Sequence, residues 1–200
     1  MAIKNSTKQA FADALKSLLV TKELSAVRIQ ELCRICGTER PTFYYHFRDK
    51  YDLVSWIYEQ DLQKSIRLSG ERYGKAQLEQ LLLILQADQN FYRKAFHDSG
   101  QNALLSHILQ SNIRLAWEVL GDEQTLVHLT REEEFQIRVY TYAWCGCLQD
   151  WVSGRYEFTA SEFAALMYRS MSELALKSLQ ESRGLHNGLF RGDRYGNQLG

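Results

Sequence analysis

Residues 42–47, with the sequence T-F-Y-Y-H-F, combine hydrogen-bonding side chains with two phenylalanines four positions apart. If this run is helical, Phe43 and Phe47 share a face that can pack, while the polar side chains point away from it. Hydroxyl, imidazole and guanidinium groups are the donors that bind phosphates and base edges in nucleic acids. The pattern therefore predicts a DNA-binding helix. Its exposed polar set would be Arg40, Thr42, Tyr44, Tyr45 and His46.

Two other interpretations of this run have less support. An aromatic-rich helix is usually core, but a core segment has no reason to set polar side chains in a row beside Arg40, Arg48 and Lys50. A metal-ligand role for His46 lacks a partner at ligand spacing. Arg40 is the residue expected to read sequence, because a guanidinium can pair with guanine through two hydrogen bonds, at about 1–3 kcal/mol of discrimination.

The elements that must hold this helix lie just before it in the chain. An amphipathic helix is expected at 6–21, with Ser6 and Gln9 as its capping box. A second short helix is expected to end at Gly37, because glycine turns a helix end without steric cost. Pro41 suits the first turn of the next helix. Two short helices would then flank a turn that contains glycine.

The whole chain contains one proline, Pro41, and is rich in helix formers. An all-α protein of about nine helices is therefore predicted. A helix starting after Asp49 should run towards Leu68 and join two domains. Thr130 with Glu133, and Thr159 with Glu162, are capping boxes that mark two later helix starts. The further helices are expected at about 76–96, 101–120, 131–153 and 159–182, with the region 76–120 subdivided.

The segment 27–50, V-R-I-Q-E-L-C-R-I-C-G-T-E-R-P-T-F-Y-Y-H-F-R-D-K, resembles the helix-turn-helix of the TetR/AcrR family. The match covers Ile29, Leu32, Cys33 and Gly37, the run 42–47 and Lys50. A resemblance of this kind implies which residues touch DNA. Phosphate contacts are implied for Tyr44, Tyr45, His46 and Lys50, and base-facing positions for Thr38, Glu39, Arg40 and Pro41.

This chain departs from the family pattern at two places. Glu23 stands where the family often has glycine at the end of the first helix, and Arg28 stands where it commonly has threonine as a helix cap. Arg28 can instead reach a phosphate. Gln30 occupies a position from which some family members touch DNA.

Cysteines and histidines give no support to a metal site or to catalysis. Cys33 and Cys36 form a C-x-x-C, which is interpreted as two small buried residues, with a thiol sensor as the alternative. Cys145 and Cys147 are two apart and so lie on different sides of a helix, which fits no tight zinc geometry. The sequence shows no glycine-framed nucleophile and no phosphate loop. We expect neither an enzyme nor a metal or cofactor site.

The region 91–151 is dense in aromatic residues and could line an apolar ligand cavity or form ordinary core. Its C-terminal part resembles a TetR-like branch that includes regulators near dihydroxyacetone-kinase genes, which implies regulation through a small molecule or a partner protein. The residues proposed to line a pocket are Phe96, His107, Trp117, Tyr140 and Trp144.

The distribution of charge agrees with a DNA-binding N-terminal end, and the hydropathy pattern bears on where the protein is located. Residues 1–52 hold nine Lys and Arg against six Asp and Glu, a net +3, and the remainder carries −3. The start of the chain lacks the apolar stretch of a signal peptide, and the apolar runs are far shorter than the roughly 20 residues that cross a membrane. A cytoplasmic protein without a membrane partner is expected.

The sequence thus predicts a DNA-binding domain at 1–50, a helical regulatory and dimerisation domain at 51–182, and a flexible tail at 183–200. The expected function is a homodimeric repressor that binds a palindromic operator in double-stranded DNA and is released by a small molecule. The alternative is a co-regulator or activator whose C-terminal domain binds a partner protein. The helices at 131–153 and 159–182 are the expected dimer surface.

Overall fold

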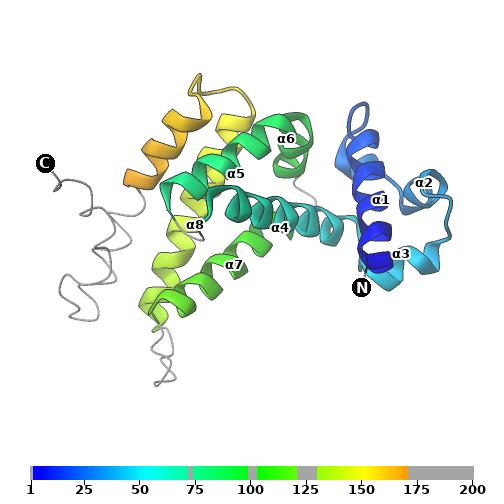
Figure 1. Cartoon of the computed structure of the whole chain (residues 1–200), viewed down its shortest axis with the longest axis horizontal. Coiled ribbons are helices and arrows are strands. Elements are labelled where there is room, and N and C mark those ends of the chain that lie inside the picture. The colour runs from blue at the N-terminus through cyan, green and yellow to red at the C-terminus, as the bar shows by residue number, and fades with distance from the viewer. Residues whose placement is uncertain (1, 72–73, 99–102, 121–129, 171–200) are drawn as a thin grey trace, which may run out of the picture.

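The computed structural model describes residues 2–71, 74–98, 103–120 and 130–170. Within these ranges all regular structure is helical, which confirms the all-α prediction. Eight α-helices, one 3-10 turn and the helical residues 160–170 fit the expected count of about nine. Helices α1–α3 form one end of the molecule, and α4 runs from them into the bundle of later helices (Figure 1). The predicted tail at 183–200 lies outside the described residues.

Helices α1 (Ala2–Leu18), α2 (Ile29–Ile35) and α3 (Arg40–His46) make up the N-terminal unit, with a 3-10 turn at Leu24–Ala26 before α2. The predicted capping box of Ser6 and Gln9 is wrong, because α1 already begins at Ala2. The side-chain amide of Gln9 instead donates to Asp13 Oδ1, one turn further on, at 2.9 Å.

Helix α4 (Lys50–Ser69) starts where the sequence predicted, directly after Asp49. The Asp49 carboxylate accepts hydrogen bonds from the backbone N–H groups of Tyr51 and Asp52, at 2.8 and 2.9 Å. These bonds satisfy two donors that a helix start leaves open, and they place negative charge at the positive end of the helix dipole. The helix packs on α1 near its start and on α5 and α7 further along.

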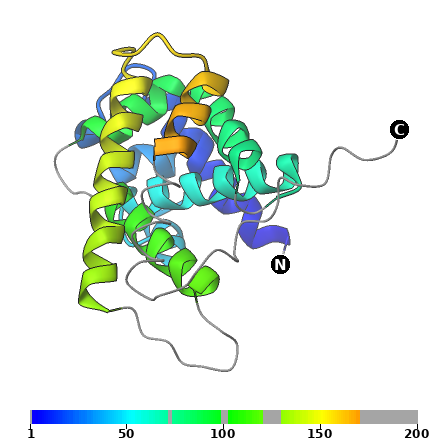
Figure 2. The same cartoon turned by 90° about the vertical axis from the view of Figure 1, so that its left-hand side faces the viewer.

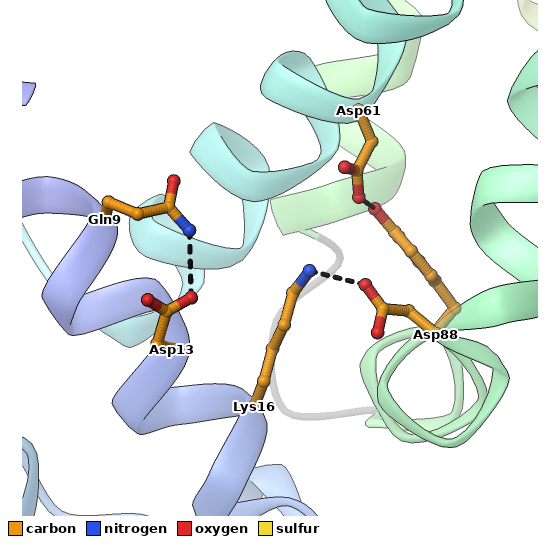
Figure 3. Close-up of polar contacts among 6 residues, drawn as sticks. Gln9, Asp13, Lys16, Asp61 and Asp88 are labelled. Atoms are coloured by element: carbon orange, nitrogen blue, oxygen red, sulfur yellow. Dashed lines mark hydrogen bonds and ion pairs between the residues drawn. The ribbon is translucent and has the colours of Figure 1, made fainter.

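The helix expected at 76–96 is two helices, α5 (Lys75–Ala87) and α6 (Gln89–His97), which meet at Asp88. The Asp88 backbone has φ −107° and ψ 30°, which breaks the helical run. Its carboxylate lies 2.5 Å from Lys16 Nζ on α1, as Figure 3 shows. Beside this pair, the Tyr92 hydroxyl on α6 donates to Asp61 on α4 at 2.5 Å. The sequence predicted that the region 76–120 is subdivided but not where, because the position of the break depends on contacts with distant helices.

Polar groups of α6 also reach the backbone just beyond the end of α1. The Asn90 amide donates to the Leu19 carbonyl at 2.9 Å, and Lys94 Nζ donates to the Lys22 carbonyl at 2.8 Å. Lys94 Nζ lies in addition 3.3 Å from Glu23 Oε1. Carbonyls at a helix C-terminus lack partners within the helix, and a positive charge there is favourable. Helix α6 therefore holds the N-terminal unit against the rest of the protein.

Helix α7 (Ala103–Leu120) packs on α4 and on α8 (Arg131–Val152), and the helical residues 160–170 lie beside the C-terminal half of α8 (Figure 2). Both predicted capping boxes are confirmed. Thr130 Oγ1 accepts from the Glu133 backbone at 3.2 Å, and Thr159 Oγ1 accepts from the Glu162 backbone at 3.2 Å. Among the described residues, no helix is long and apolar enough to span a membrane.

Among the residues that the structure describes, one hydrophobic cluster runs from the N-terminal unit into the later helices. Phe11 of α1 and Phe43 of α3 are fully buried, with ring centroids 5.2 Å apart and edge-to-face. Phe47, also buried, completes the cluster at 6.4 Å from Phe11. The prediction that Phe43 and Phe47 share a packed face is confirmed.

Truncation of Phe43 to alanine should lower the free energy of unfolding by about 3–5 kcal/mol, because it opens a cavity between α1 and α3. Tyr45→Ala on the same helix is the matched control, since Tyr45 is 66% exposed; it should change stability by roughly 0.5 kcal/mol. Urea denaturation followed by circular dichroism measures both. Equal losses in the two variants would show that the Phe43 ring does not anchor α3.

Candidate nucleic-acid interface

The turn between α2 and α3 has the glycine that the sequence predicted. Gly37 follows the end of α2 with φ +62°, a left-handed conformation that residues with a Cβ adopt at a cost. The Thr38 N–H then donates to the Cys33 carbonyl at 2.9 Å. This turn fixes the direction in which α3 leaves α2.

The start of α2 shows how the chain manages without the family threonine. Glu31 Oε2 accepts a hydrogen bond from the Arg28 backbone N–H at 3.1 Å, and Lys22 binds the same carboxylate. Both contacts, the Lys22 one first, hold the pKa of Glu31 below its usual value. Glu23 has φ −77° and ψ 151°, an extended backbone that requires no glycine. Neither departure from the family pattern disrupts the helix-turn-helix.

The outer face of α3 presents an ordered polar surface. Arg40 Nη2 donates to the Tyr44 hydroxyl at 3.3 Å, and its guanidinium lies 5.8 Å from the centre of the Tyr44 ring. The Tyr45 ring meets His46 edge-on, with centroids 5.0 Å apart. Tyr44 and Tyr45 are exposed although both are large aromatic residues. An α-helix with such a face matches the width of the DNA major groove.

All eleven residues predicted to contact DNA lie on α2, the turn, α3 or the start of α4, and none is buried. The exposed ones are Arg28, Gln30, Glu39, Arg40, Pro41, Tyr44 and Tyr45. The half-buried ones are Thr38, Thr42, His46 and Lys50.

Sequence reasoning did not include Arg34, an arginine on α2, among the candidate DNA-binding residues. Arg34 is exposed, and together with Arg28 and Gln30 it lines an open hollow of about 460 Å³ along α2. Lys22 and Glu31 also line the hollow. The spacing of four between Gln30 and Arg34 places them on one helix face, and this was the signal that could have identified Arg34.

Lys50 is engaged within the protein. Its Nζ donates to the carbonyls of Ser25 and Val27, at 2.7 and 3.1 Å. Burial lowers the pKa of its ammonium group, although the nearby carboxylates of Asp98 and Asp49 act in the opposite direction.

The cysteines of the C-x-x-C lie at the end of α2. Cys33 is buried, Cys36 is half-buried, and both are free thiols. Burial raises the pKa of each, which disfavours the reactive thiolate. These surroundings support the interpretation as small packing residues over that of a thiol sensor.

Two of the proposed pocket residues, His107 and Trp144, lie near buried Tyr58. His107 Nε2 is 3.3 Å from Glu59 Oε2, and this contact is the main cause that lowers the pKa of Glu59. The His107 ring meets the Tyr58 ring edge-on, with centroids 6.3 Å apart. Burial raises the pKa of Tyr58, and buried Trp144 lies close enough to act on that pKa in the opposite direction. The structure thus brings His107 and Trp144 together around Tyr58.

The remaining pocket candidates are less closely grouped. Phe96 is partly buried against the core, with its ring 6.4 Å from that of Tyr92. Tyr140 on α8 is half-buried. The side chain of Trp117 lies outside the described residues. A ligand pocket formed by these residues stays a prediction.

Two family models match the chain, one on each side of residues 57–74. The model described as "Bacterial regulatory proteins, tetR family" matches residues 12–56, which include α2, the turn and α3. The model described as "Transcriptional regulator C-terminal region" matches residues 75–173. The predicted domain limits at 50 and 182 are not settled by these ranges and stay predictions.

Two individual proteins are also similar. The HTH-type dhaKLM operon transcriptional activator DhaS of Lactococcus lactis subsp. lactis (strain IL1403) is 33% identical over 92 residues, 45% of this chain. That match spans 49% of the relative, about half its length. A solved structure named dihydroxyacetone kinase operon activator DhaS shares the fold, with TM-score 0.53 and 21% identity over 88% of this chain and 97% of that one.

The helix-turn-helix geometry, the two matched models and the shared fold agree with one another and with the resemblance noted at residues 27–50. The chain therefore belongs to the TetR family of bacterial transcriptional regulators.

Proposed function

We propose that this regulator binds a specific operator in double-stranded DNA by inserting α3 into the major groove. The observation that carries the proposal is the two-sided character of α3. Phe43 and Phe47 fix the helix on Phe11, whereas Arg40, Tyr44 and Tyr45 of the same helix are exposed. A recognition helix needs such an anchored inner face and a polar outer face.

Arg40 is the proposed reader of base identity, at the start of α3. Its guanidinium is already oriented by the hydrogen bond to Tyr44 and lies 5.8 Å from the centre of that ring. Pre-orientation lowers the entropy lost when the side chain pairs with a guanine. Arg28 and Arg34 on α2 are placed to contact phosphates, and the two tyrosines offer hydroxyls to the same backbone.

Selection from a pool of random duplexes should enrich a palindrome for the wild-type protein. Arg40→Gln should relax the preference at one position of each half-site, by about 1–3 kcal/mol. Arg34→Gln should keep the sequence preference and reduce the slope of log K against log salt by roughly 1.8, about 0.9 for each protomer of the proposed dimer. Sequencing of bound pools and fluorescence anisotropy at several salt concentrations measure the two effects.

If wild type and Arg40→Gln enrich the same sequence, Arg40 does not read a base. Absence of any enrichment by the wild type would contradict the proposed function as a whole and favour a regulator that needs a partner protein.

A palindromic operator requires a two-fold dimer whose recognition helices are about 34–36 Å apart, and we propose that α8 supplies its surface. Phe135, Val139 and Tyr142 are 66%, 47% and 53% exposed, and their spacing of four and three places them on one face of α8. Gly146 continues this face, and a Cβ built there meets no atom within 4 Å. An exposed apolar stripe of this kind is costly unless a second copy covers it.

Val139→Glu should shift the protein from dimer to monomer, because it buries a charge in the proposed interface. Leu83→Glu on α5 is the control, since Leu83 is also an exposed apolar residue but lies on another helix. Sedimentation equilibrium measures the mass of each. A monomeric wild type, or dissociation of both variants alike, would argue against the α8 surface.

The sign of regulation has two candidates. The sequence favours a repressor released by a small molecule, whereas the 33% identity to a protein named as an operon activator supports the activator alternative. Transcription in vitro from a promoter carrying the selected operator distinguishes them. Added protein lowers transcript yield if it represses and raises it if it activates.

A small-molecule effector, if it is the physiological signal, should bind in the C-terminal helices around Tyr58, His107 and Trp144. A ligand at 100 times its dissociation constant adds about 2.7 kcal/mol of stability. A thermal-shift screen with metabolites should therefore find a clear rise in melting temperature for the wild type. That rise should be smaller for His107→Phe. If no metabolite of a broad panel raises the melting temperature of the wild type, a partner protein is favoured as the effector.

A further inference from the structure

We propose that Lys94 of α6 is a positioning residue for the helix-turn-helix, because it holds Lys22, which in turn holds the Glu31 carboxylate at the start of α2. Its effect on operator affinity rests on the DNA binding proposed above for α2 and α3. The connection joins α6 to α2 without passing through α4 or through the phenylalanines of α1 and α3.

The first contact of this connection lies between α6 and the turn that follows α1. Lys94 Nζ donates to the Lys22 carbonyl at 2.8 Å and lies 3.3 Å from Glu23 Oε1. The Lys94 side chain is only 11% exposed. An enclosed ammonium group is costly to separate from its partners, so Lys94 fixes the backbone at residues 22–23 relative to α6.

The second contact lies between the side chain of Lys22 and α2. The Lys22 ammonium group binds the Glu31 carboxylate, which also accepts a hydrogen bond from the Arg28 backbone N–H at 3.1 Å. Glu31 thereby satisfies a backbone donor that the start of a helix leaves open. Lys22 holds this carboxylate in place at the end of α2 that carries Arg28 and Gln30.

Both places at which the chain departs from the family pattern belong to this connection. Glu23, in place of the frequent glycine, lies beside Lys94, and Arg28, in place of the common threonine, donates its N–H to Glu31. A threonine cap would hold the helix start through its own hydroxyl. Here the start of α2 depends on a carboxylate whose cation is positioned from α6. A displacement of α6 should therefore change the position of α2.

Hydrogen exchange of the full-length protein without DNA tests the connection. The amides of Glu31 and Leu32 donate to the Arg28 carbonyl, and Lys94→Met should make them exchange about fivefold faster. Lys94→Arg keeps the charge and the donors, so it should restore the wild-type rate. No acceleration in Lys94→Met would overturn the proposal.

Asn90→Leu is the matched control for the general docking of α6. The Asn90 amide also joins α6 to the region beyond α1, at the Leu19 carbonyl, but it does not hold residue 22. The two amides at the start of α2 should keep their wild-type exchange rates in this variant. If Asn90→Leu accelerates them as much as Lys94→Met does, docking alone accounts for the effect and the role of Lys94 is refuted.

Operator affinity, measured by fluorescence anisotropy from low to high salt, is the functional readout. Lys94→Met should weaken binding about fivefold with an unchanged slope of log K against log salt, because its side chain is enclosed. In the Glu31→Gln background the same substitution should add almost nothing, since the connection is already broken. Arg93→Met removes the same charge from an exposed position on α6 and should bind as the wild type does. A fivefold loss that persists in Glu31→Gln, or a lower slope in Lys94→Met, contradicts the proposal.

Lys22→Met keeps the test decisive if Lys94→Met does not fold. The Lys22 side chain is 37% exposed, and the backbone carbonyl of this residue stays available to Lys94. The variant should accelerate exchange at Glu31 and Leu32 and leave the amides of α6 unchanged; wild-type protection at the start of α2 would refute the connection. A wild-type protein that selects no operator would contradict the proposed function instead, and the exchange results would still decide the role of Lys94.

Discussion

The packing of two phenylalanines of α3 on one phenylalanine of α1 is the interaction on which the rest of the site depends. Phe43 and Phe47 enclose Phe11, and all three are buried. Because these rings fix the rotation of α3, the residues between them are forced outwards. The exposed tyrosines therefore follow from the buried phenylalanines, and the face of α3 that we propose to bind DNA results from a hydrophobic constraint.

Polar contacts then attach this unit to the later helices. Lys16 pairs with Asp88, and Asn90 and Lys94 of α6 bind carbonyls beyond the end of α1. Such contacts are directional, so a change in the position of α6 would be transmitted to α1 and, through its phenylalanine, to α3. Effector binding can alter operator affinity only if it favours one arrangement of these elements over another.

Local signals in the sequence were enough for much of this structure. Helical spacing predicted the packed face of α3, Gly37 predicted the turn, and both Thr-x-x-Glu motifs marked true helix starts. The features that the sequence missed have a common physical origin. The position of the break at Asp88 and the engagement of Lys50 by two backbone carbonyls depend on partners 72 and 23 to 25 residues away in the chain, which no local pattern encodes. The capping box at Ser6 failed because α1 begins earlier than its apolar pattern suggested.

The most direct test of the account is photo-crosslinking from two side chains of equal exposure. Tyr45 on α3 and Phe135 on α8 are each 66% exposed, so a benzophenone amino acid at either position is equally accessible. With bound operator, the account predicts a protein–DNA adduct from position 45 that maps to the major groove, and a protein–protein adduct from position 135. A DNA adduct from position 135, or none from position 45 on fully bound duplex, would contradict it.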